Sequence, residues 1–149
     1  MWQTPITDRT LQDVKELVML RDKIAGYWDS ASSEDKDKWL NGVKGAVNIS
    51  DINRIIGNSE YLRDMLIIAG YSIWFDNTSV VTRDNLPYYT VLNAKLRNNI
   101  LTLLDGFYDT GFVNIEQTNR PNFEVINAME INLLNLNTLY DNMLQGYRY

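Results

Sequence analysis

The sequence predicts a mainly α-helical protein, a bundle of four to five helices from degenerate repeats with one or two short β-hairpins or extended ribbons. The first observation is a phrase that recurs in residues 51–66, 91–106 and 125–144. In each copy an apolar residue precedes an asparagine, and a second asparagine follows five residues later: Asn53/Asn58, Asn93/Asn98 and Asn127/Asn132. Repetition of a helical unit is typical of scaffold and interaction proteins.

The second observation is the spacing of apolar residues, which recur at intervals of three and four within each repeat and so predict amphipathic helices. Ser50 is the predicted N-cap of the first of these helices, Gly70 ends it, and the last helix begins near Asn122 or Phe123. The predicted core stripes are Ile52, Ile55, Ile56, Leu62, Met65 and Leu66, then Leu92, Leu96, Ile100, Leu103 and Phe107, then Ile126, Met129, Leu133, Leu136, Tyr140 and Met143.

Two further helices are predicted before the repeats. Thr10 and Asp13 resemble a capping box at the start of a helix over residues 10–25, and Gly26 follows as a stop. A short, weak helix is expected after Ser33. Nothing between these elements has the composition of a linker, so residues 1–149 are interpreted as a single helical domain.

The two connectors between repeats are expected to be extended. Within residues 71–89, the apolar runs 73–75 and 80–82 flank a DNTS turn signal and predict a short hairpin. Residues 107–120 carry glycine punctuation around a second extended run. Isolated hairpins are marginally stable in water, so these ribbons should lie on the helices or on another chain.

Asparagine is a poor helix former, because its amide competes for nearby backbone groups. Residues five apart lie about 140° apart on a helical wheel, so the two asparagines of a pair cannot share a narrow seam. We expect the first one (Asn53, Asn93 or Asn127) to lie at the edge of the apolar stripe, where its amide can hold the backbone of a loop. The second should lie nearer solvent or a loop. The alternative is that all are surface residues.

Composition argues against most catalytic sites. The chain has no Cys and no His, which removes disulfides, the usual zinc sites and imidazole chemistry. No phosphate-binding loop, dinucleotide fingerprint or nucleophile elbow occurs. We therefore predict no enzyme activity and no catalytic, cofactor-binding or metal-binding residues. A net charge of −5 argues against nucleic acid, and no apolar run is long enough to span a membrane.

The stretch ISDINRIIGNSEYLRDML resembles the DxNRIxxNxxYL phrase of small tail and baseplate structural proteins of phages and prophages of Gram-positive bacteria. The opening WQTPITDRTLQDV is similar to their start, where a Trp and a Pro-x-Thr-Asp turn precede the first helix. NAKLRNNILTLL and NAMEINLLNLNTLY look like the degenerate repeats that follow. Only Asn53-Arg54-Ile55 matches the Asn-Arg-Ile core in full, so Arg54 joins the asparagines as a predicted structural residue.

This resemblance implies a non-enzymatic virion protein, an adaptor that works as a homo-oligomer with neighbouring virion proteins and is assembled in the host cytoplasm. Aromatic and Arg side chains are enriched at interface hot spots. The predicted interface residues are accordingly Trp2, Trp74, Phe75, Tyr147, Arg148 and Tyr149.

Two alternatives stay open. One is a cytoplasmic regulatory or adaptor module that binds another protein in a groove between repeat helices. The other, with less support, is a DNA-binding protein that uses the basic residues Lys15, Arg21, Lys23, Lys36, Lys38 and Lys44.

Overall fold

The computed structural model shows a mainly α-helical protein. It describes residues 1–76, 78–105, 107, 111–118 and 122–146, without the side chains of residues 89 and 144–146. The described chain forms five α-helices packed as a bundle and contains no β-strand. Short 3₁₀ turns at Trp28–Ser30 and Arg83–Asn85 accompany them. Nowhere in this part of the chain is a helix both long and apolar enough to cross a membrane.

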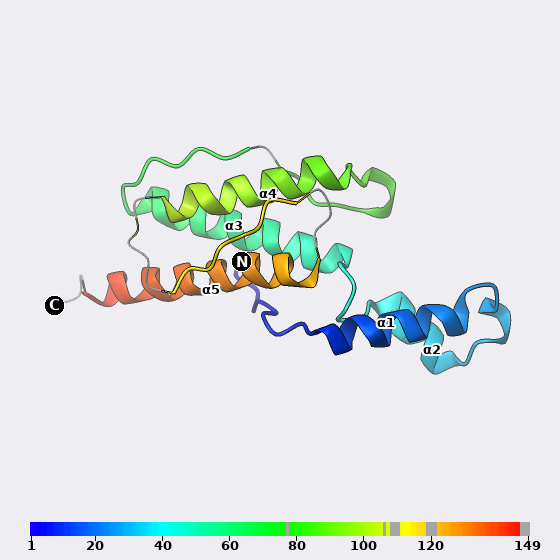
Figure 1. The fold of residues 1–149 in the computed structure, drawn as a ribbon. Helices are drawn as coiled ribbons and strands as arrows, with labels where there is room; N and C mark the ends of the chain where they lie inside the picture. The colour runs from blue at the N-terminus through cyan, green and yellow to red at the C-terminus, as the bar shows by residue number, and fades with distance from the viewer. Residues whose placement is uncertain (77, 106, 108–110, 119–121, 147–149) are drawn as a thin grey trace.

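The first two helices form a hairpin. Helix α1 covers Leu11–Ile24, and its capping box of Thr10 and Asp13 is the predicted one. Helix α2 covers Ser33–Asn41; its N-cap is Ser32 and not the expected Ser33, because the Ser32 hydroxyl accepts from the Asp35 backbone N–H. The α1–α2 hairpin (residues 11–41) extends beyond the end of the bundle at which α3 begins (Figure 1).

The three repeats form the long helices α3 (Ile49–Ile68), α4 (Tyr89–Leu104) and α5 (Phe123–Gly146). The expected cap Ser50 is wrong: Asn48 caps α3, because Asp51 in the first turn accepts a hydrogen bond from the Asn48 backbone N–H. Each of these helices contacts the other two, and all three run in the same direction (Figure 1).

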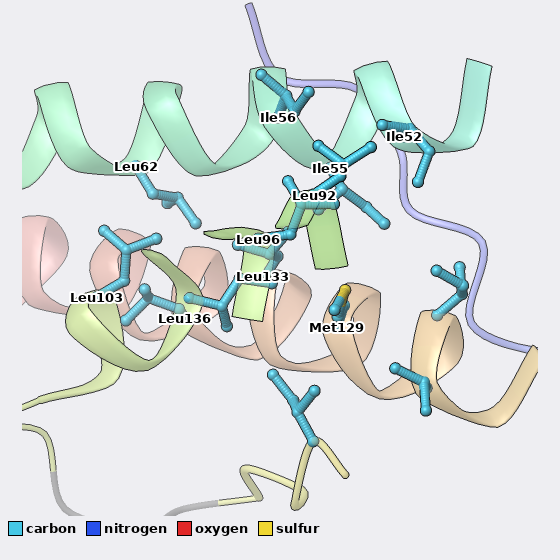
Figure 2. Packing of buried hydrophobic residues seen from close by; sticks show 14 of the residues in the cluster. Ile52, Ile55, Ile56, Leu62, Leu92, Leu96, Leu103, Met129, Leu133 and Leu136 are labelled. Carbon is cyan, nitrogen blue, oxygen red and sulfur yellow. The ribbon is translucent and has the colours of Figure 1, made fainter. Parts of the chain in front are cut away.

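The core lies along the axis of these three helices. Ile55, Leu96 and Leu133 are each 2% exposed or less, and the predicted stripes meet there (Figure 2). Met65, Phe107 and Met143, which were also expected in the core, are half-buried. Helix periodicity therefore identified the buried faces, and the deviations lie toward one end of each predicted stripe.

Parallel packing of consecutive helices requires connectors that return along the bundle. Helix α3 has 20 residues and so spans about 30 Å, which about ten extended residues cover at ~3.3 Å each. The connectors 69–88 and 105–122 have more residues than this, and Figure 1 shows their described parts running back along the helices. The predicted hairpin in 71–89 is wrong: in the described residues these segments are extended but bond to helix side chains and not to one another.

Candidate functional site

Each extended segment is held at both ends by an asparagine side chain. The amide of Asn58 accepts from the backbone N–H of Gln3 at 2.8 Å and donates to its carbonyl at 2.8 Å. Asn127 makes the same pair of bonds with Arg9 at 3.2 and 2.9 Å. We call this paired bonding an asparagine clamp. A carboxamide suits it because it carries one acceptor and donors side by side, as a neighbouring β-strand would.

The two connectors are clamped in the same way. Segment 76–81 is held at Asp76 by Asn99 and at Val81 by Asn53. In each case the side-chain amide accepts a hydrogen bond from the backbone N–H and donates one to the backbone carbonyl of the same residue. Segment 113–118 is held by Asn132, again with two bonds to Val113. At its other end Asn93 donates to the Thr118 carbonyl at 2.7 Å.

These clamps follow a threefold pattern. Segment 3–9 joins α3 to α5, segment 76–81 joins α4 to α3, and segment 113–118 joins α5 to α4. Just before each segment an aromatic residue (Trp2, Phe75 or Phe112) packs against the core. The molecule is thus three units of extended segment and helix, and the α1–α2 hairpin is an insertion between the first segment and its helix.

This arrangement refines the prediction for the asparagine pairs. The second member was expected nearer solvent or a loop, and Asn58 and Asn132 do bind extended segments, although they are at most 1% exposed. In α4 the second clamp is Asn99 and not Asn98, which is exposed. On the wheel Asn98 lies about 160° from the buried Ile100, whereas Asn99 lies about 100° from it. The core stripe therefore decides which asparagine can reach a segment.

A buried cluster of four charged residues reinforces the first clamp. Arg9 contacts Asp51 at 2.9 Å and Glu130 at 2.8 Å, and Arg54 bonds to the same two carboxylates. Each of the four is at most 9% exposed. The cluster is electrically neutral, and it joins the first extended segment to α3 and α5. Arg54, predicted as structural from the resemblance, therefore acts through charge, while Arg9 and Glu130 were not anticipated.

Burial alone would raise the pKa of Asp51. Hydrogen bonds from Arg54 and from the Asn48 backbone, together with the charges of Arg9 and Arg54, outweigh burial and hold that pKa below its ordinary value. Burial likewise disfavours the charged form of Arg54, but its bonds to Glu130 and Asp51 raise its pKa overall. Both residues are therefore charged in the folded protein at neutral pH.

The hairpin is attached to the bundle through its base. Lys44 contacts Asp8 at 3.0 Å, just before α1. A Cβ at Gly45 would lie 2.2 Å from the backbone carbonyl oxygen of Asp13, so only glycine permits this approach of the chain to α1. The Asn48 amide donates to the Val43 carbonyl at 3.0 Å and closes the turn into α3.

Most large apolar residues of the hairpin are exposed. Its helices bury only Leu20 and Ile24, whereas Met19, Trp39 and Leu40 are 60, 39 and 58% exposed. A cleft of about 380 Å³ lies between α1 and α2, with Met19 and Leu20 among its apolar lining. Charged residues line it as well: Glu16, Lys23, Asp35, Lys38 and Lys44. Large apolar residues such as Ile68, Trp74 and Tyr88 are exposed outside the hairpin as well. The hairpin therefore differs from the rest of the chain in how few apolar residues its helices bury and in its cleft, and not in exposure alone.

The predicted interface residues are dispersed. Trp2 is half-buried against Tyr61, with ring centroids 6.0 Å apart, and Phe75 packs on the core beneath Arg63. Trp74 is 79% exposed. The predicted tail residues Tyr147, Arg148 and Tyr149 lie outside the described residues. Only Trp74 of the described members therefore presents most of its surface to solvent.

The six basic residues proposed for DNA are all on or next to the hairpin, and acidic residues accompany them. Arg21 contacts Asp22, Lys38 contacts Glu34, and Lys44 contacts Asp8. The remaining members, Lys15, Lys23 and Lys36, are distributed over α1 and α2. Among the described residues there is also no group of three or more acidic side chains placed to hold a metal ion.

Comparison with known proteins adds no relative: no family model, no curated protein and no solved structure matches the chain.

Proposed function

We propose that the protein is a non-enzymatic assembly component whose clamped three-helix body holds the α1–α2 hairpin out as a contact arm. The observation that carries the proposal is the contrast between these two parts. The body buries its apolar stripes and holds its extended segments with internal hydrogen bonds. The helices of the hairpin bury only Leu20 and Ile24, so they have almost no core of their own, and Met19, Trp39 and Leu40 are exposed beside the cleft or near it.

A clamped three-helix body suits an assembly component that must keep its conformation while it is in contact with neighbouring subunits. The clamps connect all three grooves between helices, and the Arg9 cluster anchors the segment that leads into the hairpin. Buried hydrogen bonds and charge pairs are costly to break once their partners are buried. Together with the likeness of Asn53-Arg54-Ile55 and its surroundings to phage tail and baseplate proteins, this supports a role as a virion adaptor.

The test uses the full chain and two substitution variants. Met19→Ser/Leu40→Ser removes exposed apolar area from the hairpin, and Ile68→Ser, 76% exposed near the far end of α3, is the matched control. Each protein is co-expressed with the products of the neighbouring genes, and complexes are measured by light scattering. We expect the hairpin variant to lose co-assembly and the control to keep it. Equal co-assembly by both would contradict the proposal.

The cleft between α1 and α2 also favours the second candidate, a protein-binding adaptor outside a virion. Its mixture of Met19, Leu20 and charged side chains fits a peptide or helix of a partner. Gene neighbourhood separates the two candidates: tail genes on either side support the virion role, and a regulator beside it supports the adaptor.

A further inference from the structure

The α1–α2 hairpin depends on its base for its orientation. Among the described residues, α1 and α2 pack on each other, and neither packs extensively on α3, α4 or α5. The hairpin extends beyond the bundle (Figure 1). Two stretches of chain join it to the body: an incoming root, residues 8–10, and an outgoing root, residues 42–48. The bonds made by these two roots therefore determine the direction in which the hairpin points.

One carboxylate holds both roots. The Oδ1 atom of Asp51 accepts hydrogen bonds from the guanidinium groups of Arg9, at 2.9 Å, and Arg54, at 2.6 Å. Its Oδ2 atom accepts from the backbone N–H and the side-chain amide of Asn48, at 3.0 and 3.1 Å. The same amide donates to the Val43 carbonyl at 3.0 Å. Arg9 lies directly before the N-cap of α1, and Val43 follows α2, so each oxygen of Asp51 serves one root.

Covalent attachment alone would leave the hairpin free to swing. An element that is attached at two points can still rotate about the line that joins them. Gly45 lies against the backbone of Asp13, so the two roots stay together during such a rotation. The bonds from Asp51 through Asn48 to Val43 add a third point of attachment, which opposes the rotation.

We propose that Asp51 is a lock that sets the orientation of the contact arm. This inference rests on the proposed function, since it concerns how the arm is presented to a partner. The lock also shapes the cleft between α1 and α2, because residues 42–44 line that cleft and Asn48 holds Val43. Release of the lock changes both the direction of the arm and one wall of the cleft.

The substitution Asp51→Asn releases one of the roots with little change in side-chain size. Both oxygens of a carboxylate are acceptors, whereas a carboxamide has one oxygen and one N–H₂ group. If the new oxygen stays with the two guanidinium groups, the N–H₂ group meets the donors of Asn48. The opposite orientation places the N–H₂ group against Arg9 and Arg54. In either orientation donors face donors at one root, and that root loses its hold.

Pulsed electron spin resonance on the spin-labelled full chain measures the swing. The chain has no native cysteine, so Ala25→Cys at the end of α1 and Thr138→Cys on α5, both exposed, carry the two labels. Because α1 has 14 residues and is about 21 Å long, a swing of about 10° moves its far end by about 4 Å. We expect Asp51→Asn to broaden the distribution of label-to-label distances by about 4 Å or more.

Asn99→Ala is the matched control. It also removes two hydrogen bonds of a buried side chain, but those bonds join α4 to Asp76, which belongs to neither root. General loosening of the body would therefore broaden the distances in both variants. We expect the parent width for Asn99→Ala and a broadened distribution for Asp51→Asn. Equal widths in these two variants, with circular dichroism showing folded helices, would overturn the lock.

Asn48→Ser tests the outgoing root alone. Serine is as good an N-cap as asparagine, but it has no amide that could bridge Asp51 and the Val43 carbonyl. We expect this variant to broaden the distances as well. Should Asp51→Asn fail to fold, the comparison of Asn48→Ser with Asn99→Ala decides in the same way, and equal widths would again overturn the lock.

The two proposals fail separately. Broadening by Asp51→Asn, with co-assembly unchanged in Met19→Ser/Leu40→Ser, would support the lock and refute the contact arm. Loss of co-assembly in Met19→Ser/Leu40→Ser, with equal widths for Asp51→Asn and Asn99→Ala, would support the contact arm and refute the lock.

Discussion

Replacing Asn99 by alanine should destabilise the protein, while the same change at its neighbour Asn98 should not. Asn99 is 3% exposed and makes two hydrogen bonds to the backbone of Asp76, at 2.8 and 3.2 Å. Asn98 is exposed on the same helix. The pair therefore separates the clamp from any general effect of asparagine in α4.

The magnitude follows from these bonds. Each buried hydrogen bond contributes about 1 kcal/mol net, and the N–H and carbonyl of Asp76 left behind add a further penalty, which the half-buried position of Asp76 reduces. Alanine regains about 0.6 kcal/mol of helix propensity at either site. We expect Asn99→Ala to lower the free energy of unfolding by about 1–3 kcal/mol and Asn98→Ala to leave it unchanged or raise it slightly.

The assay is urea unfolding followed by circular dichroism, with thermal unfolding as a second measure. For a chain of this size a loss of 1 kcal/mol corresponds to about 2–4 °C in the midpoint temperature. Two results would refute the reasoning: equal stability of the two variants, or a larger loss for Asn98→Ala. Either would show that the clamp at Asp76 does not contribute in solution.

Two further predictions concern the hairpin base and the buried cluster. Gly45→Ala should loosen the hairpin base, because its Cβ would meet the Asp13 carbonyl oxygen at 2.2 Å, and hydrogen exchange of the α1 amides measures this. Unchanged exchange in α1 would contradict that prediction. Gly57→Ala is the control: its Cβ would meet nothing within 4 Å, so it should raise the free energy of unfolding, measured in urea, by about 1 kcal/mol. Because the folded pKa of Asp51 is lowered, its stabilising effect is present above the unfolded pKa of about 3.9 and is lost as pH falls through the folded value. Asp51→Asn should therefore lower the free energy of unfolding by about 1.5–3 kcal/mol at pH 7. The difference in this free energy between the variant and the parent protein should shrink below pH 4. A difference that does not change with pH would argue against a charged Asp51.

Several local features of the fold follow from the sequence alone. The spacing of residues such as Leu92, Leu96 and Ile100 predicted the buried face of α4, and the Thr10/Asp13 box predicted the start of α1. Both depend on residues within one or two turns of each other. The repetition around Asn53, Asn93 and Asn127 was likewise readable without a structure, because the repeats have similar local sequences.

The partners of those residues depended on tertiary structure. The wheel places Asn99 nearer the core stripe than Asn98, but the packing of α4 on α3 and α5 decides that the segment it reaches is the one at Asp76. Arg9 and Glu130 are 121 residues apart, so no local pattern joins them. The direction of the helices was also decided by tertiary packing, since the connectors are long enough for either orientation. The sequence determined which residues are apolar and which are repeated, because both are local properties, and the fold determined which distant groups satisfy one another.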